Sequence, residues 1–277
     1  MTDADALLQS ILAAPDDDAP RLIYADWLDE HGDADRAAFI RAQIELACTR
    51  PNHSKHDSLV QIERTLLGKH AEAWSAWVPV WVRERKYHRG FLDWVRCDAD
   101  AFIAGADVLR RHTPLAGARL DGNRHIARPL FISRCLEGLR SLTLSIDNMP
   151  RGDWTGLADC PYLYRLRELI LNSKGPADEL VSALMSPETL PALRRLRLTW
   201  CRLGDEQSSR LVQHKWSTRL RALDLRNNFI GDEGAIAMAE SPYLDRLVML
   251  NLKGNAFAID GWVAEKLRQR FGSRLRL

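Results

Sequence analysis

The most regular feature of the chain is a leucine phrase that returns every 27 residues. The phrase Leu-x-x-Leu-x-Leu begins at Leu139, Leu166, Leu193, Leu220 and Leu247, and a weaker copy, with Ala118 in its middle position, begins at Leu115. The alternation within each phrase predicts a short strand whose leucines face a core. A fixed period of this length predicts a repeat architecture in which each unit stacks on its neighbours.

The segments between the phrases repeat as well, and they predict a turn followed by a short helix. The sequence Leu-Gly-Asp-Glu at 203–206 returns as Ile-Gly-Asp-Glu at 230–233, and its Asp is placed to cap the helix that follows, such as one over 235–239. The sequence Cys-Pro-Tyr-Leu at 160–163 returns as Ser-Pro-Tyr-Leu at 241–244 and marks the way back to the next strand.

These phrases resemble the leucine-rich repeat, whose pattern L-x-x-L-x-L-x-x-N/C is met in full at 193–201, 220–228 and 247–255. The resemblance implies an α/β fold, a curved solenoid with a parallel sheet on its concave face and helices on its convex face. The final Asn or Cys can hydrogen-bond backbone groups left unpaired where the strand ends. Asp147 and Lys174 replace that residue in two repeats, where we expect irregular turns.

We expect the solenoid to cover 90–277, with about six repeats of 24–27 residues and a cap at each end. A first strand is predicted at 90–97, with Val95 and Cys97 inward, and the first convex helix at 98–114. At the other end, a helix over 261–271 and a short strand over 274–277 close the stack.

The first 48 residues follow a different pattern that predicts three short helices, separated at 15–20 and 31–35. Thr2 and Asp5 have the spacing of a capping box, and runs of Asp precede the next two helices, where the helix dipole favours acids. The string over 5–47 closely resembles the bacterial repeat-companion domain of planctomycete-type genomes, a module that precedes repeats and has no assigned activity. We therefore expect a small all-α domain at 1–48 and a helical Trp-rich linker or N-cap at 49–89.

Composition places the chain among globular proteins, with 277 residues, 46% hydrophobic and 27% charged. The net charge of +2 conceals an acidic start, because residues 1–50 carry 4 bases and 11 acids (−7) and the remainder 35 and 26 (+9). No apolar run has the length of a membrane span, and the N-terminus has acids where a signal peptide has bases, which predicts a cytoplasmic protein. Five scattered cysteines without a CxxC pair predict reduced thiols. We expect a monomer.

Catalytic and metal motifs are missing from the sequence. It has no nucleophile elbow, phosphate loop, dinucleotide fingerprint or HExxH helix, so we predict no enzyme, no catalytic residue and no cofactor. Cys48, His53 and His56 could in principle hold zinc, but without a fourth ligand we interpret them as a solvated loop. The three Asp at 16–18 lack the spacing of a calcium loop and are interpreted as caps, so no metal site is predicted.

Partner binding on a solenoid uses strand positions whose side chains leave the core. We single out Trp94, Arg96, Arg119, Glu168, Ile170, Arg195, Arg197, Asp224, Arg226, Met249 and Lys253 as the binding residues of the concave face. Tryptophan, arginine and apolar side chains together are typical of protein interfaces. We therefore predict a non-catalytic module or adaptor that binds a protein partner of unknown identity.

Two alternatives stay open. The chain could bind a polyanion or nucleic acid through its Arg-rich solenoid surface, which is disfavoured because Glu84 interrupts the basic stretch at 83–89. Less favoured still is an enzyme with an unrecognised site. Arg140, Arg167, Arg194 and Arg221, one per repeat, must form a ladder whose charge is balanced either by acids such as Glu168 or by an acidic partner.

Overall fold

The computed structural model describes residues 2–122, 127–146, 152, 154–172, 177–186 and 189–277. The chain divides into two compact units, and each is described by itself. Unit 1 comprises Met1–Arg96 and Gly105–Ala116, and unit 2 comprises Cys97–Ala104 and Gly117–Leu277. The domain boundaries expected from the sequence, after 48 and after 89, stay predictions.

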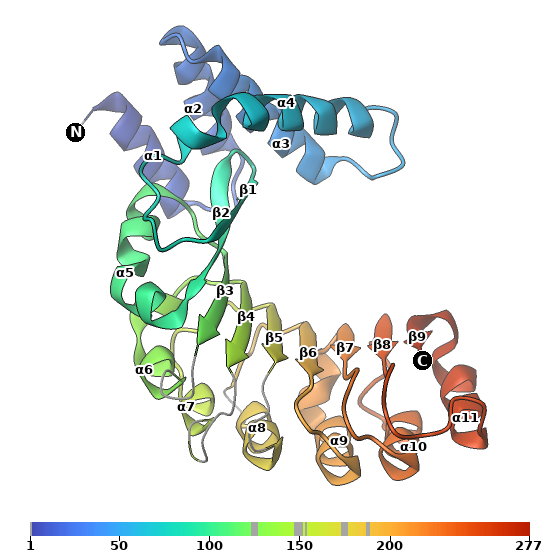
Figure 1. The fold of residues 1–277 in the computed structure, drawn as a ribbon. Coiled ribbons are helices and arrows are strands. Elements are labelled where there is room, and N and C mark those ends of the chain that lie inside the picture. Colours follow the sequence, from blue (N-terminus) through green and yellow to red (C-terminus); the bar gives the residue numbers. More distant parts are fainter. Residues whose placement is uncertain (1, 123–126, 147–151, 153, 173–176, 187–188) are drawn as a thin grey trace. The chain divides into compact units, whose positions relative to one another are not determined.

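Unit 1 begins with the three helices that the sequence predicts, α1 (Asp3–Ala13), α2 (Ala19–Glu30) and α3 (Ala34–Cys48), followed by α4 (His56–Trp74) (Figure 1). The expected capping box is present, because Thr2 and Asp5 bond each other's backbone N–H groups. Asp33 likewise caps α3 by accepting the N–H of Arg36 at 3.2 Å. The start of α2 differs, since Asp17 rather than the N-cap residue accepts the N–H of Ala19.

A hairpin follows these helices where the sequence predicts a helical linker. Strand β1 (Glu84–His88) pairs antiparallel with β2 (Phe91–Asp98), so the helical prediction for 49–89 is wrong at 84–88. The turn between them is Arg89-Gly90, both residues with positive φ (51° and 84°), as a two-residue hairpin turn requires. A Cβ on Gly90 would overlap Ile40 of α3, so only glycine fits there. Strand β1 depends on the packing of Gly90 against Ile40, and the local sequence at 84–88 does not show this long-range contact.

The core of unit 1 joins α1, α2, α3 and the hairpin. Ile11, Ala25, Ile40 and Phe91 are buried together, with Tyr24 and Trp27 packed against them. Helix α5 (Ala99–His112) follows β2, at the place where the first convex helix was expected.

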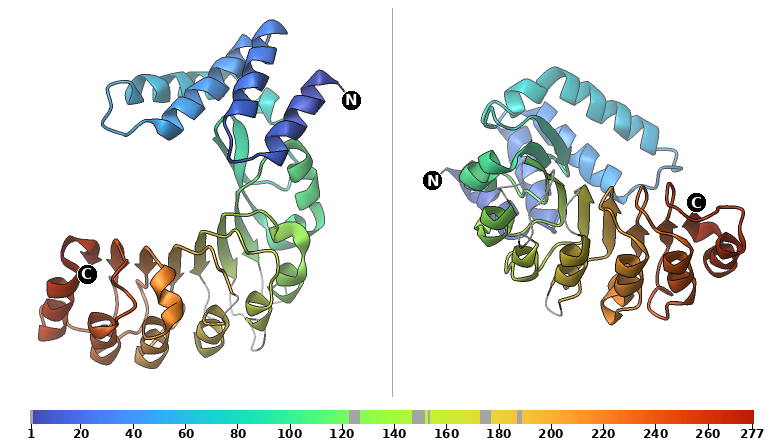
Figure 2. Two further views of the ribbon diagram at one scale, coloured as in Figure 1. Left: turned by 180° about the vertical axis from the view of Figure 1, so that it is seen from behind. Right: turned by 60° about the horizontal axis from the view of Figure 1, so that its bottom comes forward.

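Unit 2 is a mixed α/β stack whose parallel strands follow one another in sequence order, consistent with a leucine-rich-repeat-like solenoid. The strands are β3 (Gly117–Gly122), β4 (Ser141–Ile146), β5 (Glu168–Asn172), β6 (Arg195–Thr199), β7 (Ala222–Asp224), β8 (Met249–Asn251) and β9 (Leu275–Arg276). The α-helices are α6 (Ala127–Ile132), α7 (Thr155–Ala158), α8 (Ala177–Leu184), α9 (Asp205–Val212), α10 (Asp232–Glu240) and α11 (Trp262–Phe271). Short 3₁₀ turns lie at η1 (Arg134–Leu136), η2 (Lys215–Arg219) and η3 (Gly272–Arg274). Figures 1 and 2 show the α-helices succeeding one another along one side of the strands.

The repeated leucines form the core of unit 2. Register pairs each middle leucine with its copy 27 residues on, as in Leu169 with Leu196 and Leu196 with Leu223. These leucines are at most 1% exposed. Because burying one leucine contributes about 1.5–3 kcal/mol, the repeated phrase supplies the main stabilisation of the stack. The last strand closes it as predicted, with Leu275 paired to Leu250.

The residue that ends each phrase bonds the backbone of the turn. Asn228 donates from Nδ2 to the carbonyls of Leu198 and Leu225, each at 2.8 Å, and accepts the N–H groups of Cys201 and Leu203. Asn255 repeats the pattern one unit later, which confirms the predicted role of this position. The substitutions at 147 and 174 lie outside the described residues.

The Asp of the Gly-Asp turn behaves differently from the sequence expectation. Asp205 does not cap its own helix, because Gly204 is the N-cap of α9. Its Oδ1 accepts the N–H groups of Gly231 (2.6 Å) and Gly234 (3.0 Å), at the start of α10 in the next repeat. The side chain thus ties one repeat to the next, because stacking places the two helix starts side by side.

Candidate functional site

The predicted binding residues of unit 2 lie on strand positions that alternate with the buried leucines. Strand register brings Glu168, Arg195, Ala222 and Met249 into one row across β5 to β8. It brings Ile170, Arg197, Asp224 and Asn251 into the adjacent row. We call Glu168, Ile170, Arg195, Arg197, Asp224, Arg226, Met249 and Lys253 the strand face.

Asp224 corrects the expectation that every member of this set is exposed, because it is only 2% exposed. One of its oxygens, Oδ2, lies 3.2 Å from Nε of Arg197 and 3.0 Å from Nη2 of Arg226. The other, Oδ1, accepts the backbone N–H of Arg226. The carboxylate therefore fixes the half-exposed guanidinium groups of Arg197, on β6, and Arg226, just after β7, and is covered by them.

Arg195 is an exposed cation of the same surface. Within the described part of the chain its side chain makes no ion pair or hydrogen bond, although it lies beside Glu168 in register. The carboxylate of Glu168 accepts instead the hydroxyl of Ser141 at 3.1 Å. A shallow hollow of about 40 Å³ lies among Glu168, Arg195, Ala222 and Met249. A guanidinium that has no internal partner and is held on a rigid strand is available to an external carboxylate.

The remaining predicted residues have separate surroundings. Arg119 on β3 contacts its neighbour Asp121 at 3.3 Å, and Lys253 lies exposed after β8. Trp94 and Arg96 belong to unit 1, where both contact β1. The ammonium of Lys86 lies 4.5 Å from the centre of the Trp94 ring, and Arg96 pairs with Glu84 at 2.6 Å.

Two exposed aromatic side chains were missed by the sequence analysis. Trp200 directly follows β6 and is 60% exposed, and Phe229 follows β7 and is 67% exposed. With Arg202, Asn227 and Gly254 among its other lining residues, they surround a hollow of about 340 Å³. In the sequence, each of them is a large apolar residue next to the Asn or Cys that ends the leucine phrase: Trp200 precedes Cys201, and Phe229 follows Asn228. These positions do not belong to the buried leucine pattern.

The arginine ladder exists in the backbone. The N–H of Arg167 donates to Arg140, that of Arg194 to Arg167 and that of Arg221 to Arg194, at 2.7–2.9 Å. The side chains of Arg194 and Arg221 donate to backbone carbonyls, those of Leu193 and Arg246. Among the described residues, Glu168 forms no ion pair with these arginines. The guanidinium groups of Arg194 and Arg221 therefore donate to backbone carbonyl oxygens and not to the Glu168 carboxylate.

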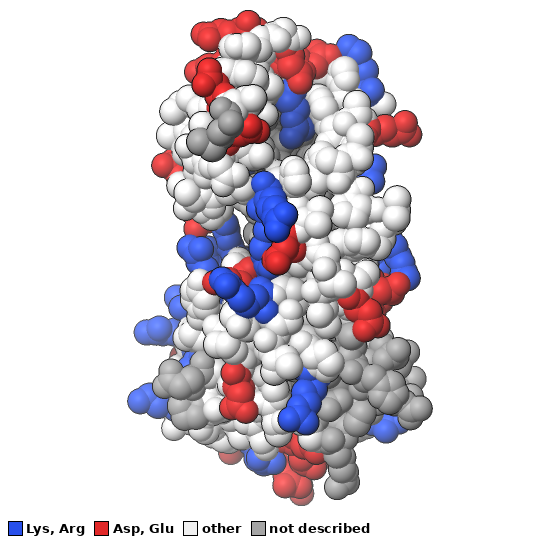
Figure 3. Space-filling model, turned by 90° about the vertical axis from the view of Figure 1, so that its left-hand side faces the viewer, with Lys and Arg blue, Asp and Glu red and all other residues white. Residues whose placement is uncertain are grey.

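Charged side chains of both signs are interspersed on the face shown in Figure 3.

Among the described residues, no three His, Cys, Asp or Glu side chains come together as metal ligands. His53 accepts the backbone N–H of Lys55, and His56 lies 3.5 Å from Asp57. None of the five cysteines, all of them in the described part of the chain, forms a disulfide, and burial raises the pKa of the Cys160 thiol. In the same part of the chain, no helix combines the length and apolar character of a membrane span.

Comparison with known proteins agrees with the repeat. A family model described as Leucine Rich repeat matches residues 190–206 and 217–239, which contain β6, β7 and most of α10. No curated protein matches the chain. The match shows a leucine-rich repeat region and does not reach the N-terminal helices.

Proposed function

We propose that the protein is a non-catalytic interaction module that binds an acidic segment of a protein partner on the strand face of unit 2. Arg195, Arg197, Arg226 and Lys253 give this surface four cations against the two carboxylates of Glu168 and Asp224. A partner that offers carboxylates meets the guanidinium groups of Arg197 and Arg226, which Asp224 already holds in place, and that of Arg195, whose donors are unused within the described part of the chain.

The observation that carries the proposal is the pair of exposed aromatic side chains in the segments that follow β6 and β7. Trp200 and Phe229 are large, apolar and more than half exposed. Aromatic and arginine side chains dominate binding energy at protein interfaces, where a few anchors outweigh the remaining contacts. The strand face and this pair together offer both the charge and the anchor. Trp94, Arg96 and Arg119 stay predictions of the sequence.

A protein partner is favoured over a nucleic acid or another polyanion. Polyphosphate backbones bind best to a surface of one charge sign. On the strand face, Asp224 already pairs with both Arg197 and Arg226, and Glu168 lies next to Arg195. A surface on which positive and negative groups alternate selects a partner by the arrangement of the partner's charges rather than by its total charge.

The test is affinity capture by the tagged full-length chain from the extract of its host, with quantitative mass spectrometry of the captured proteins. Arg195→Glu reverses one exposed charge without touching the leucine core, and Trp200→Ala removes the anchor. We expect the specific partner to bind at least tenfold more weakly to Arg195→Glu. For Trp200→Ala, loss of about 2 kcal/mol corresponds to roughly thirtyfold weaker binding.

The matched control is Lys215→Glu, which makes the same charge reversal at an exposed residue of η2, outside the strands. All variants are first checked for native circular dichroism. Capture that survives both Arg195→Glu and Trp200→Ala would reject the strand face as the interface. Binding of heparin or DNA that falls equally in Arg195→Glu and Lys215→Glu, without any protein partner, would favour the polyanion alternative.

A further inference from the structure

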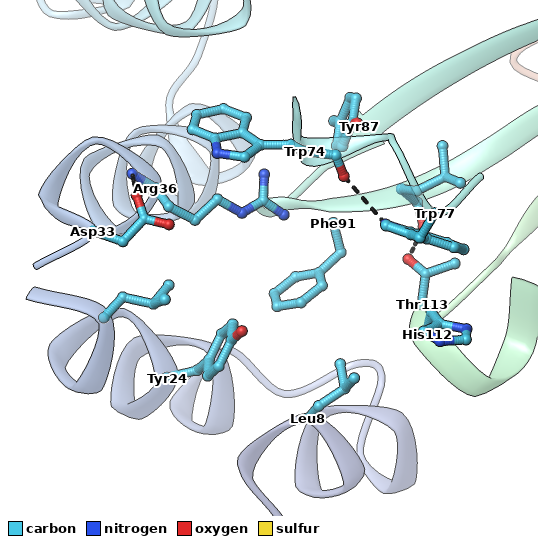
Figure 4. Close-up of a pocket in the computed structure, with 12 residues that line it drawn as sticks. Leu8, Tyr24, Asp33, Arg36, Trp74, Trp77, Tyr87, Phe91, His112 and Thr113 are labelled. Atoms are coloured by element: carbon cyan, nitrogen blue, oxygen red, sulfur yellow. Dashed lines mark hydrogen bonds between the residues drawn. The ribbon is translucent and has the colours of Figure 1, made fainter. Parts of the chain in front are cut away.

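Unit 1 contains a partly open pocket that the proposed function does not use. Its volume is about 290 Å³, close to the lower end of small-molecule sites. The walls come from α1, α2, the start of α3, the end of α4, the hairpin and the end of α5. Five of the twelve lining residues are aromatic, namely Tyr24, Trp74, Trp77, Tyr87 and Phe91 (Figure 4).

A cation extends into this aromatic lining. Arg36 lies on the first turn of α3, and its guanidinium carbon is 4.6 Å from the centre of the Trp74 ring and 5.7 Å from that of Phe91. Its Nη2 donates to the carbonyl of Gly90 at 2.6 Å, while Gln43, two turns further along α3, accepts the N–H of the same glycine. The bond to Gly90 holds the guanidinium, which lies between the rings of Trp74 and Phe91 in Figure 4.

Arg36 has no counter-ion among the described residues. Its Nη1 is buried without a hydrogen-bond partner, and no carboxylate forms an ion pair with it. The hydroxyl of Tyr87, which lines the same pocket, is also buried without a partner. Burial lowers the pKa of Arg36, and the rings of Phe39, Trp74, Tyr87 and Phe91 around its guanidinium supply only part of the stabilisation that an ion-paired carboxylate would give. Two idle donors beside one pocket are the arrangement that an anionic group would complete.

We propose that this pocket binds a small molecule that combines a planar aromatic ring with a carboxylate. The carboxylate accepts from Nη1 of Arg36, and the ring packs between the aromatic walls. The proposal is independent of the strand face of unit 2.

Other charged and titratable groups of the pocket do not supply the missing anion. Asp33 lines the pocket and its charge partly offsets the lowering of the pKa of Arg36, but among the described residues the two side chains form no ion pair; its Oδ1 accepts the backbone N–H of Arg36 as the cap of α3. The ring of His112 stacks on Trp77 with centres 4.9 Å apart, and its Nδ1 is bonded to the carbonyl of Val108. The hydroxyl of Tyr24 faces the same space and can only add a donor for a carboxylate at neutral pH.

The test uses 2-naphthoate as the probe and the neutral 2-naphthamide as its match in shape. Titration calorimetry with the full-length chain measures both affinities. We expect 2-naphthoate to bind with one site per chain and at least tenfold more tightly than the amide. Equal affinities, or no binding of 2-naphthoate at millimolar concentration, would overturn the proposal, and neither result depends on a variant.

Variants then locate the site. Arg36→Gln removes the unpaired charge and should weaken 2-naphthoate at least tenfold while leaving the amide nearly unchanged. Arg41→Gln is the matched control, since it removes the same charge from the same helix, at a residue paired with Asp26 and Asp29 outside the pocket. If Arg36→Gln does not fold, Leu8→Trp replaces it, because a larger side chain at this lining position should fill the space and abolish binding of both probes. Wild-type affinity in either folded variant would place the probe elsewhere and refute the site.

Discussion

Truncation of Asn228 tests the energetic role of the residue that ends each leucine phrase. In Asn228→Ala, the buried N–H groups of Cys201 and Leu203 lose their acceptor, and the carbonyls of Leu198 and Leu225 lose a donor. A buried donor without a partner costs about 1–3 kcal/mol, whereas a carbonyl retains a second lone pair for other contacts. The two donors dominate, so we expect a loss of about 2–6 kcal/mol in the stability of unit 2.

Asn255→Ala provides a comparison for the loss of stability expected in Asn228→Ala. Asn255 accepts one N–H group, that of Ile230, so its truncation should cost about half as much, about 1–3 kcal/mol. Asn52→Ala, in an exposed turn of unit 1, should change stability by less than about 0.5 kcal/mol.

Native-state hydrogen exchange is the appropriate assay, because a chain of two units does not guarantee two-state unfolding. Each 1.4 kcal/mol is a factor of ten in protection, so the amides of Cys201 and Leu203 should exchange at least about 25-fold faster in Asn228→Ala. The reasoning is refuted if these amides keep their protection, or if Asn228→Ala and Asn255→Ala cost the same.

Two further predictions concern single contacts. Hydrogen bonds from Lys69 and then His70 lower the pKa of Asp35, so its stabilising effect is present above the ordinary aspartate value of 3.8 and is lost as pH falls through the lowered folded-state value. Melting curves should therefore show Asp35→Asn below wild type at pH 7 and equal to it at pH values below the transition; a constant gap would contradict this. In Gly234→Ala, the new Cβ meets Oδ1 of Asp205 at 2.7 Å and should cost about 1–3 kcal/mol in urea unfolding, whereas Gly68→Ala in α4 meets nothing within 4 Å and should stabilise by up to about 1 kcal/mol. The same sign for both glycines would exclude the steric explanation.

The leucine register was predictable from the sequence because it depends on a local pattern that repeats. A strand phrase of fixed length, copied every 27 residues, leaves one way to stack leucine on leucine, and Leu169, Leu196 and Leu223 pair accordingly. Caps that bond within their own helix, as Asp33 does to the N–H of Arg36, were predictable because the two residues are three positions apart, whereas the bond of Asp205 to the next repeat was not.

The sequence predicted which residues lie on the strand face, but not how far each side chain is exposed or with which groups it pairs. Alternation along β7 places Asp224 outside the leucine core, yet the carboxylate is buried because Arg197 from the preceding strand and Arg226 cover it. Arg195, with the same residue type two positions before Arg197, stays exposed. The difference depends on which side chain lies opposite in the neighbouring strand, and a single strand carries no such information.

Contacts between distant residues were decided only by the tertiary structure. The sequence predicted the strand at 90–97 but not its partner β1 or the turn between them, in which Gly90 fits against Ile40 and bonds Arg36, 54 residues away in sequence. The same packing surrounds the Arg36 guanidinium with rings from α4 and the hairpin, and leaves its Nη1 without a partner. A sequence determines local propensity and period by itself, because both act over a few residues. Whether a charge is paired, covered or left facing a pocket depends on the groups that folding brings around it.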